Sequence, residues 1–218
     1  MADGKTHAPT EHTLEDKVRA AMRPEGDYGR EVLARMNSAE GAHAALSTWG
    51  LSHLDVKKDV RMLDVGCGGG ANLLRLLTLA PEGHVTGLDY SETSVATSRE
   101  TAAAEIAAGR CEVVQGDVAA MPFADGSFDL MTGFETIYFW PDVPRTLAEI
   151  RRVLAPGGTL FICDEDDGMT DEDWTSAIAE LRVYTEGELT DLLTAAGFTS
   201  IKTWHDVETH WLCASAIA

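Results

Sequence analysis

The chain has 218 residues, of which 44% are hydrophobic and 24% are charged, as in an ordinary soluble globular protein. Its 17 Lys and Arg residues against 36 Asp and Glu residues give a formal net charge of −19, which repels phosphate backbones and anionic membranes, so we expect neither nucleic acid nor a membrane as a partner. No apolar run approaches the roughly 20 residues that span a bilayer, and no apolar secretory signal opens the chain, so we expect a cytoplasmic protein.

The first part of the chain is expected to be a tail followed by short helices. Residues 1–13 show no apolar period, which predicts a disordered tail. Apolar spacing and breakers then predict three helices, namely Leu14–Met22, Tyr28–Met36, and one that Ser38 caps and that ends at Trp49 with Gly50 just beyond it. Because residues 14–59 precede the first strand, we interpret them as an addition to the core.

From residue 60 onward, strand-like and helical segments alternate. The predicted strands are Val60–Val65, His84–Leu88, Cys111–Gln115, Ser127–Thr132 and Thr159–Cys163. The predicted helices between them run through Leu73–Leu77, from a Ser91 cap to Gly109, and over Pro144–Leu154. Such alternation predicts an α/β fold with a parallel sheet covered on both faces.

The last part of the chain changes character. Thr185 and Glu188 have the spacing of a capping box, which predicts a helix that ends near Gly197. The runs Ser200–His205 and Trp211–Ala216 follow with only a short polar link, which is typical of an antiparallel strand pair. None of the four cysteines has C-x-x-C spacing, so we expect reduced thiols at Cys67, Cys111, Cys163 and Cys213.

A glycine-rich segment is the most informative part of the chain. An apolar run ends at Asp64-Val65, and the glycines of Gly66-Cys67-Gly68-Gly69-Gly70 follow before a helical pattern begins. Such glycines permit positive φ and the close approach of a ligand. Ligands of an open parallel sheet bind at the carboxyl ends of its strands, where Asp64, Asp89 and Asp117 stand. These features predict a cofactor site at that edge.

The same residues bear on the kind of cofactor. Asp89, about 20 residues beyond the glycines, is placed to bind ribose hydroxyls in NAD or in an adenosine-bearing methyl donor. The glycines read G-x-G-G-G rather than G-x-G-x-x-G, and Asp64 would repel a pyrophosphate but attract an ammonium or sulfonium group. Asp117 can accept a hydrogen bond from an adenine amine. A nicotinamide-dependent oxidoreductase is therefore the weaker alternative.

An ordered set of motifs carries a family resemblance. The matching segments are Leu63–Gly70, Gly87–Ser91, Gly116–Phe123, Phe128–Leu130 and Ile150–Gly158. The chain resembles class I S-adenosylmethionine-dependent methyltransferases of the small-molecule type, the group that includes ubiquinone and menaquinone methyltransferases. The resemblance implies a Rossmann-like three-layer sandwich over residues 60–218, with a seven-stranded, mostly parallel sheet, an antiparallel last strand and an N-terminal helical lid over residues 14–59.

The resemblance also implies the cofactor and its site. The cofactor would be S-adenosyl-L-methionine, with Gly66 and Gly68 around its methionine part, Tyr90 on its adenine and Val118 beside the adenine. The whole implied set of cofactor-binding residues is Asp64, Gly66, Cys67, Gly68, Asp89, Tyr90, Asp117, Val118 and Phe134.

The methyl acceptor is less well defined by the sequence. Glu135 directly follows the fourth strand and is the leading catalytic candidate, and Tyr138-Phe139-Trp140 either floors a pocket or packs the next helix. The acidic stretch Asp164–Gly168 has no EF-hand spacing and no His or Asn to complete a set, so we expect a solvated loop and no metal. An O-, N- or C-acceptor, a monomer or a homodimer, and a non-catalytic S-adenosylmethionine-binding protein all remain open.

Overall fold

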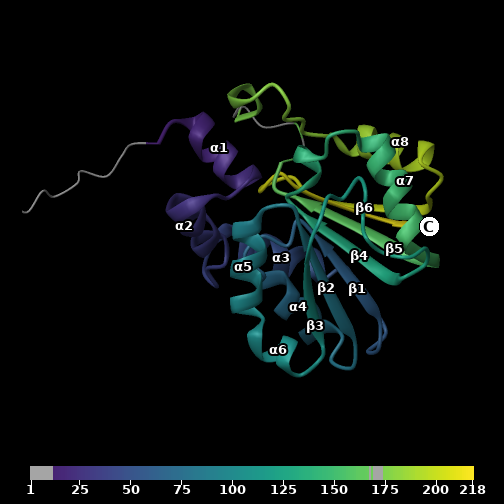
Figure 1. Ribbon diagram of the computed structural model, residues 1–218. Helices are drawn as coiled ribbons and strands as arrows, with labels where there is room; N and C mark the ends of the chain where they lie inside the picture. The colour runs from purple at the N-terminus through teal and green to yellow at the C-terminus, as the bar shows by residue number, and fades with distance from the viewer. Residues whose placement is uncertain (1–11, 167, 169–173) are drawn as a thin grey trace, which may run out of the picture.

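A seven-stranded sheet forms the centre of the molecule in the computed structural model, which describes residues 12–166, 168 and 174–218 (Figure 1). The strands lie in the order β3-β2-β1-β4-β5-β7-β6. Their bounds are Arg61–Val65 for β1, His84–Asp89 for β2, Cys111–Gln115 for β3, Phe128–Phe134 for β4, Leu154–Asp164 for β5, Thr199–Asp206 for β6 and Trp211–Ile217 for β7. Strands β1 to β5 pair in parallel, whereas β7 is antiparallel to both β5 and β6. The predicted sheet is confirmed.

Helices cover both faces of this sheet, so the expected three-layer arrangement is also confirmed. Helices α3, α4 and α5 lie over one face, and α7 and α8 lie over the other (Figure 1). The helix bounds are Leu14–Met22 for α1, Gly26–Met36 for α2, Ala42–Leu51 for α3, Ala71–Leu79 for α4, Glu92–Thr101 for α5, Ala103–Ala107 for α6, Val143–Val153 for α7 and Glu186–Ala195 for α8. Short 3-10 helices span Ile137–Phe139 and Trp174–Ala177. Among the helices described, none combines the length and the apolar character needed to cross a membrane.

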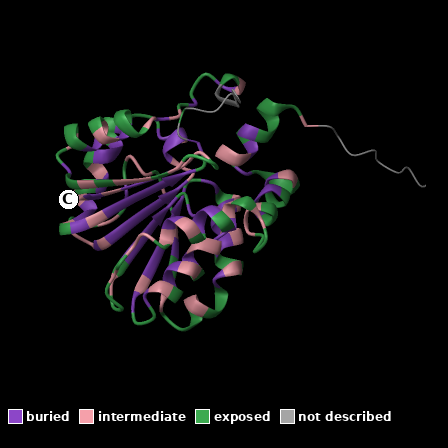
Figure 2. Cartoon of the chain, turned by 180° about the vertical axis from the view of Figure 1, so that it is seen from behind, coloured by how far each residue is buried: buried purple, intermediate pink, exposed green. Residues whose placement is uncertain are grey.

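The central strands are buried from both sides, as Figure 2 shows. In β1, Met62 packs into the core under α3 to α5, whereas Leu63 and Val65 pack into the core under α7 and α8. This explains why β1 carries apolar residues on both of its faces rather than on one face only. The Ser91 cap and the capping box of Thr185 and Glu188 are present as predicted, so short polar signals fixed the starts of α5 and α8.

The third helix differs from its prediction. Helix α3 begins after Gly41 rather than after Ser38, and Gly50 lies inside it rather than beyond its end. A Cβ atom on Gly50 would stand 2.7 Å from Cys163 Sγ and 3.2 Å from Phe134 Cε1. Gly50 is therefore needed for close packing of α3 on the sheet, not for ending the helix. The predicted helix after Ser91 is likewise divided, at Ala102, into α5 and α6.

Two of the four cysteines are paired, which corrects the expectation of four reduced thiols. Cys163 of β5 and Cys213 of β7 form a disulfide, whereas Cys67 and Cys111 are free and buried. The two paired cysteines are register partners on adjacent antiparallel strands, with Cα atoms 4.1 Å apart. They lie 50 residues apart in the sequence, so their spacing gave no sign of this contact. The predicted disordered tail, residues 1–13, falls almost entirely outside the described residues.

Candidate functional site

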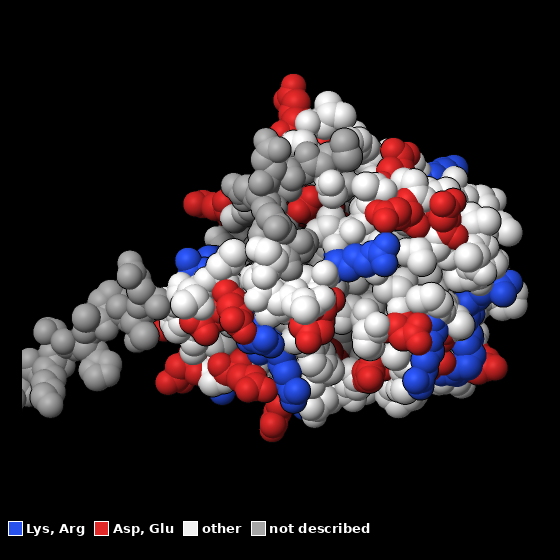
Figure 3. Space-filling model, turned by 90° about the horizontal axis from the view of Figure 1, so that it is seen from above, with Lys and Arg blue, Asp and Glu red and all other residues white. Residues whose placement is uncertain are grey.

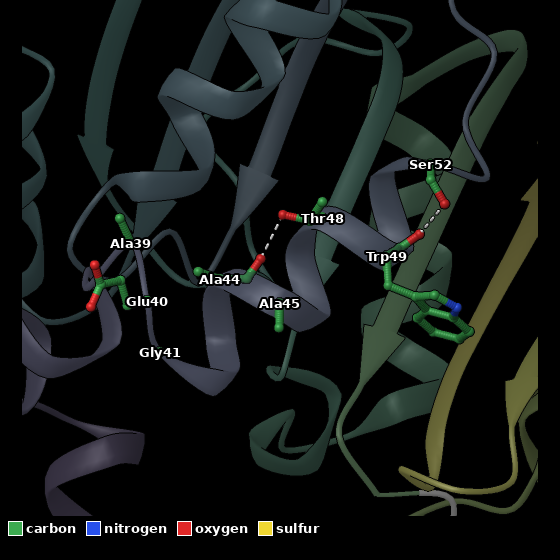
Figure 4. Close-up of a pocket in the computed structure, with 8 residues that line it drawn as sticks. All are labelled: Ala39, Glu40, Gly41, Ala44, Ala45, Thr48, Trp49 and Ser52. Carbon is green, nitrogen blue, oxygen red and sulfur yellow. Dashed lines mark hydrogen bonds between the residues drawn. The ribbon is translucent and has the colours of Figure 1, made fainter.

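A cavity of about 850 Å³ lies where the carboxyl ends of the parallel strands meet. Residues that directly follow or end β1, β2, β3, β4 and β5 contribute to its wall, and α1, α2 and α3 close it from the other side. A second, shallow depression runs along α3 (Figure 4). Of the described residues that line it, Glu40 alone is ionisable, and the Thr48 and Ser52 hydroxyls donate to backbone oxygens of their own segment. The cavity at the strand ends is therefore the candidate site.

The glycine loop after β1 forms part of the cavity wall. Gly66, Gly68 and Gly70 have φ values of 69°, 54° and 86°, in the left-handed region that favours glycine. A Cβ atom on Gly66 would collide with Thr136 Cγ2, whereas at Gly68 the nearest heavy atom, Leu33 Cδ2, would be 3.8 Å away. The space beside Gly68 is therefore open, so a ligand can approach its backbone closely.

Asp89, at the end of β2, lines the cavity and is held by the backbone. Its Oδ2 accepts a hydrogen bond from the N–H of Gly68 at 2.9 Å, and its Oδ1 accepts one from the N–H of Ser91 at 2.9 Å. Burial raises the pKa of this carboxyl, and the two N–H groups oppose that effect. Because each carboxylate oxygen has a further lone pair, Asp89 can accept from a ligand as well.

The other residues expected around an adenosyl group also line the cavity. Tyr90 is 38% exposed, and its hydroxyl donates to the carbonyl of Met22 in α1 at 2.6 Å. Asp117 uses Oδ1 to accept from the N–H of Ala119 at 2.8 Å, which is a turn contact that leaves Oδ2 available. Val118 and Phe134 belong to the same wall.

Two predicted cofactor residues, Asp64 and Cys67, are not part of this wall. Asp64 is only 2% exposed, and its Oδ1 accepts from the Thr132 hydroxyl at 2.6 Å. Burial raises the pKa of Asp64 to about 7. Cys67 is buried with its Sγ 3.4 Å from Ser98 Oγ, and burial raises the pKa of its thiol. Both side chains are therefore buried rather than exposed at the cavity.

A second group of polar side chains occupies a different part of the cavity wall. Nδ1 of His43 in α3 is hydrogen-bonded to Oε2 of Glu135, the residue that follows β4, and Glu165 lies beside them. One nitrogen or oxygen atom from each of the three residues lies within 4.8 Å of the others. The hydrogen bond to Glu135 raises the pKa of His43. Glu165 is exposed as a residue, but burial of its carboxyl group and the negative charge of Glu135 raise its pKa to about 7.

The acidic stretch after β5 is not the solvated loop that its composition predicted. Asp164 and Asp166 are only 3% and 5% exposed. The N–H groups of Glu165 and Asp166 donate to the Tyr138 hydroxyl at 2.9 and 3.3 Å. Tyr138 both lines the cavity and belongs to the core, so the two roles considered for the aromatic cluster occur together.

Sequence reasoning found Glu135, set Glu165 aside as part of the acidic stretch Asp164–Gly168, and missed His43. His43 is separated from Glu135 by 92 residues, and only the packing of α3 on the sheet brings them together. The one available signal was a lone histidine in the otherwise apolar first turn of α3, Ala42–Ala45.

Comparisons with known proteins agree with this geometry. Residues 63–162 match a family model described as a methyltransferase domain. A demethylmenaquinone methyltransferase of Listeria monocytogenes is 38% identical over 110 residues, which cover 50% of this chain and 46% of that protein. A ubiquinone/menaquinone biosynthesis C-methyltransferase of Paracoccus denitrificans is 38% identical over 124 residues, or 57% and 50% of the two chains. The chain therefore matches about half the length of these relatives.

Solved structures show the same fold. A SAM-dependent methyltransferase from Aquifex aeolicus has a TM-score of 0.72 at 20% identity, covering 88% of this chain and 99% of that one. The [4+2]-cyclase SpnF has a TM-score of 0.73 at 18% identity, covering 96% and 97%. Together with the matched domain and relatives, they support the resemblance: residues 63–162 match a methyltransferase domain, and the described chain shares the fold of a SAM-dependent methyltransferase.

Proposed function

We propose that this protein transfers a methyl group from S-adenosyl-L-methionine to a small molecule. The observation that carries the proposal is that Gly66, Gly68, Asp89 and Asp117 line one cavity at the carboxyl edge of the sheet. The open backbone at Gly68 and the buried carboxyl of Asp89 both fit an adenosyl ligand with a cationic methionine part.

Each predicted cofactor residue has a defined task in this proposal. Asp89 binds the ribose hydroxyls, Tyr90 and Val118 contact the adenine ring, and Asp117 accepts from the adenine amine. Asp64, buried in β1, supplies negative charge toward the methionine ammonium group, while Gly66, Gly68 and Phe134 shape that end of the cavity and buried Cys67 packs beneath it. When bound, the cofactor supplies a methyl group on a positively charged sulfur, and the protein supplies alignment and the exclusion of water.

Calorimetric titration tests the proposal directly. S-adenosylmethionine and S-adenosylhomocysteine are expected to bind, and NAD is not. Asp89→Ala is expected to weaken that binding by about 2 to 3 kcal/mol, because charged hydrogen bonds in a buried site are lost. The matched control is Asp191→Ala, on the exposed side of α8. Binding of NAD in preference to both sulfur compounds, or an unchanged affinity in Asp89→Ala, would contradict the proposal.

The chemical nature of the acceptor is a separate question. The relatives are a demethylmenaquinone methyltransferase and a ubiquinone/menaquinone biosynthesis C-methyltransferase, but this chain matches only about half of the length of each. The matched domain, residues 63–162, contains Glu135 but neither His43 nor Glu165. A non-catalytic S-adenosylmethionine-binding role would be indicated by binding without release of S-adenosylhomocysteine in a metabolite extract. The cytoplasmic location and the monomeric or homodimeric state stay predictions.

A further inference from the structure

The His43–Glu135 pair has the arrangement of a proton acceptor and its orienting group. Nδ1 of His43 is hydrogen-bonded to Glu135, whereas Nε2 makes no hydrogen bond to any described residue. A carboxylate on one ring nitrogen fixes the tautomer and leaves the other nitrogen as the basic one. Because His43 lines the cavity, that nitrogen belongs to the site in which the acceptor would lie.

The backbone at Glu135 supports a functional role for this pair. Glu135 has a φ of 55°, a left-handed conformation that is unfavourable for a residue with a side chain. Its N–H donates to the carbonyl of Cys163 at 2.9 Å, which holds it to the end of β5. Within the described structure, its Oε1 is buried and has no hydrogen-bond partner. A buried carboxylate oxygen of this kind is available to a donor on a ligand.

The charges around the pair favour a cationic ligand. His43 is faced by Glu135 after β4, by Glu165 after β5 and by Arg35 of α2. Buried Asp166 lies near Glu165, and Glu180 also lines the cavity, whereas burial raises the pKa of neighbouring Asp164 and favours its uncharged form. Among the described lining residues, Lys17 is the only Lys or Arg. Such a surrounding attracts an ammonium group and repels a carboxylate or a phenolate.

The aromatic side chains beside this group suit the rest of such a molecule. Phe139 and Trp140 follow Tyr138 in the cavity wall, and most of the wall is apolar. Aromatic faces pack against an organic skeleton and also attract ammonium groups. The acceptor end of the cavity therefore combines apolar walls with a concentrated negative charge.

Building on the proposed methyl transfer, we propose that His43, Glu135 and Glu165 form an acceptor site for a protonated amine, and that Nε2 of His43 removes the amine proton. Glu165 pairs with the ammonium group as it enters. The N–H bond breaks and its proton moves to Nε2, while Glu135 stabilises the resulting imidazolium. The freed nitrogen lone pair forms a bond to the methyl carbon of the S-adenosylmethionine donor. The carbon–sulfur bond breaks with its electron pair on sulfur, which leaves S-adenosylhomocysteine.

The pairing of His43 with Glu135 can be measured by NMR. In protein with ¹⁵N-labelled histidine and bound S-adenosylhomocysteine, His43 is expected to titrate above pH 6.5, and Glu135→Gln is expected to move this titration to lower pH. The matched control, Glu40→Gln, removes an exposed carboxylate at the shallow depression near α3 and should leave the His43 titration unchanged. A His43 titration that Glu135→Gln does not move would overturn the proposal.

The choice of acceptor can be measured with three probes of similar shape. In protein loaded with S-adenosylhomocysteine, calorimetry is expected to show 2-phenylethylamine binding at least tenfold more tightly than 2-phenylethanol, with phenylacetate weakest. Glu165→Gln is expected to remove most of this preference. Equal or tighter binding of phenylacetate would overturn the proposal.

A divalent cation is the alternative ligand of the same three side chains. Stoichiometric binding of Zn²⁺ or Mn²⁺ that is lost in His43→Asn would also overturn the amine proposal. Failure of S-adenosylhomocysteine to bind would instead contradict the proposed methyl transfer. The two failures are therefore distinguishable.

Discussion

Asp64 shows how a single buried carboxyl links the cofactor site to stability. Burial raises its pKa to about 7, against 3.8 for an ordinary Asp. Between these two values, the folded chain keeps a proton that the unfolded chain has released. The free energy of unfolding therefore falls as the pH rises from about 4 to about 7, by roughly 4 kcal/mol for this group. A cationic ligand near the glycine loop would offset this cost.

We expect Asp64→Asn to stabilise the ligand-free protein at pH 8 but not at pH 4. The amide keeps an acceptor for the Thr132 hydroxyl but cannot become charged. Urea denaturation at the two pH values measures the difference, with exposed Asp191→Asn as the control. A difference between Asp64→Asn and the wild type that is the same at pH 4 and pH 8 would show that the charge of Asp64 is not responsible.

The N-terminal helices are attached to the loops of the cofactor site by single hydrogen bonds. The Tyr90 hydroxyl donates to Met22 O, and the Ser91 hydroxyl donates to Pro24 O, both at 2.6 Å. Nδ2 of Asn37 donates to Gly69 O at 2.7 Å. Helices α1 and α2 also line the cavity, which supports their predicted role as a lid.

Hydrogen exchange tests the predicted lid. S-adenosylhomocysteine is expected to slow amide exchange in α1 and α2, because a ligand in the cavity would hold them against the strand ends. Helix α8, on the other side of the molecule, serves as the internal reference (Figure 1). Unchanged exchange in α1 and α2 with slowed exchange in the glycine loop would show that these helices do not close over the ligand.

The packing of α3 on the sheet depends on Gly50. A Cβ atom there would press on Cys163 and Phe134, so Gly50→Ala is expected to lower the free energy of unfolding by about 1 to 3 kcal/mol. Gly187 of α8 has no heavy atom within 4 Å of the same added Cβ atom, so Gly187→Ala provides the matched control. Chemical denaturation of both variants gives the comparison, and equal stability of the two would mean that α3 does not pack as closely as described.

Local sequence patterns were enough to predict most helices and strands, the antiparallel strand pair at the end of the chain and the glycine loop. The bounds of α1 and β3 match their predictions at both ends. The structure differs from the sequence prediction where the role of a residue depends on contact with a residue far away in the sequence. Gly50, the Cys163–Cys213 pair and His43 all owe their roles to contacts with parts of the chain far away in sequence. Sequence spacing records helix and strand periods, but it does not record which side chains meet across the sheet.

The net charge of −19 affects the stability of the whole folded protein. Acidic side chains are spread over the face seen in Figure 3, with basic ones interspersed. Mutual repulsion of these charges opposes the compact state, and salt screens it. The melting temperature is therefore expected to rise between 20 and 300 mM NaCl, as measured by scanning fluorimetry. A melting temperature that falls with added salt would indicate that attractive ion pairs dominate instead.

A crystal structure with bound S-adenosylhomocysteine tests the proposed cofactor site most directly. We expect the adenosyl group in the cavity at the strand ends, with its ribose hydroxyls on Asp89, its adenine amine near Asp117 and its methionine part along Gly66 and Gly68. The sulfur should then face His43 and Glu135. Electron density for the ligand at another site, or in this cavity with Asp89 and Asp117 turned away from it, would contradict the proposed function.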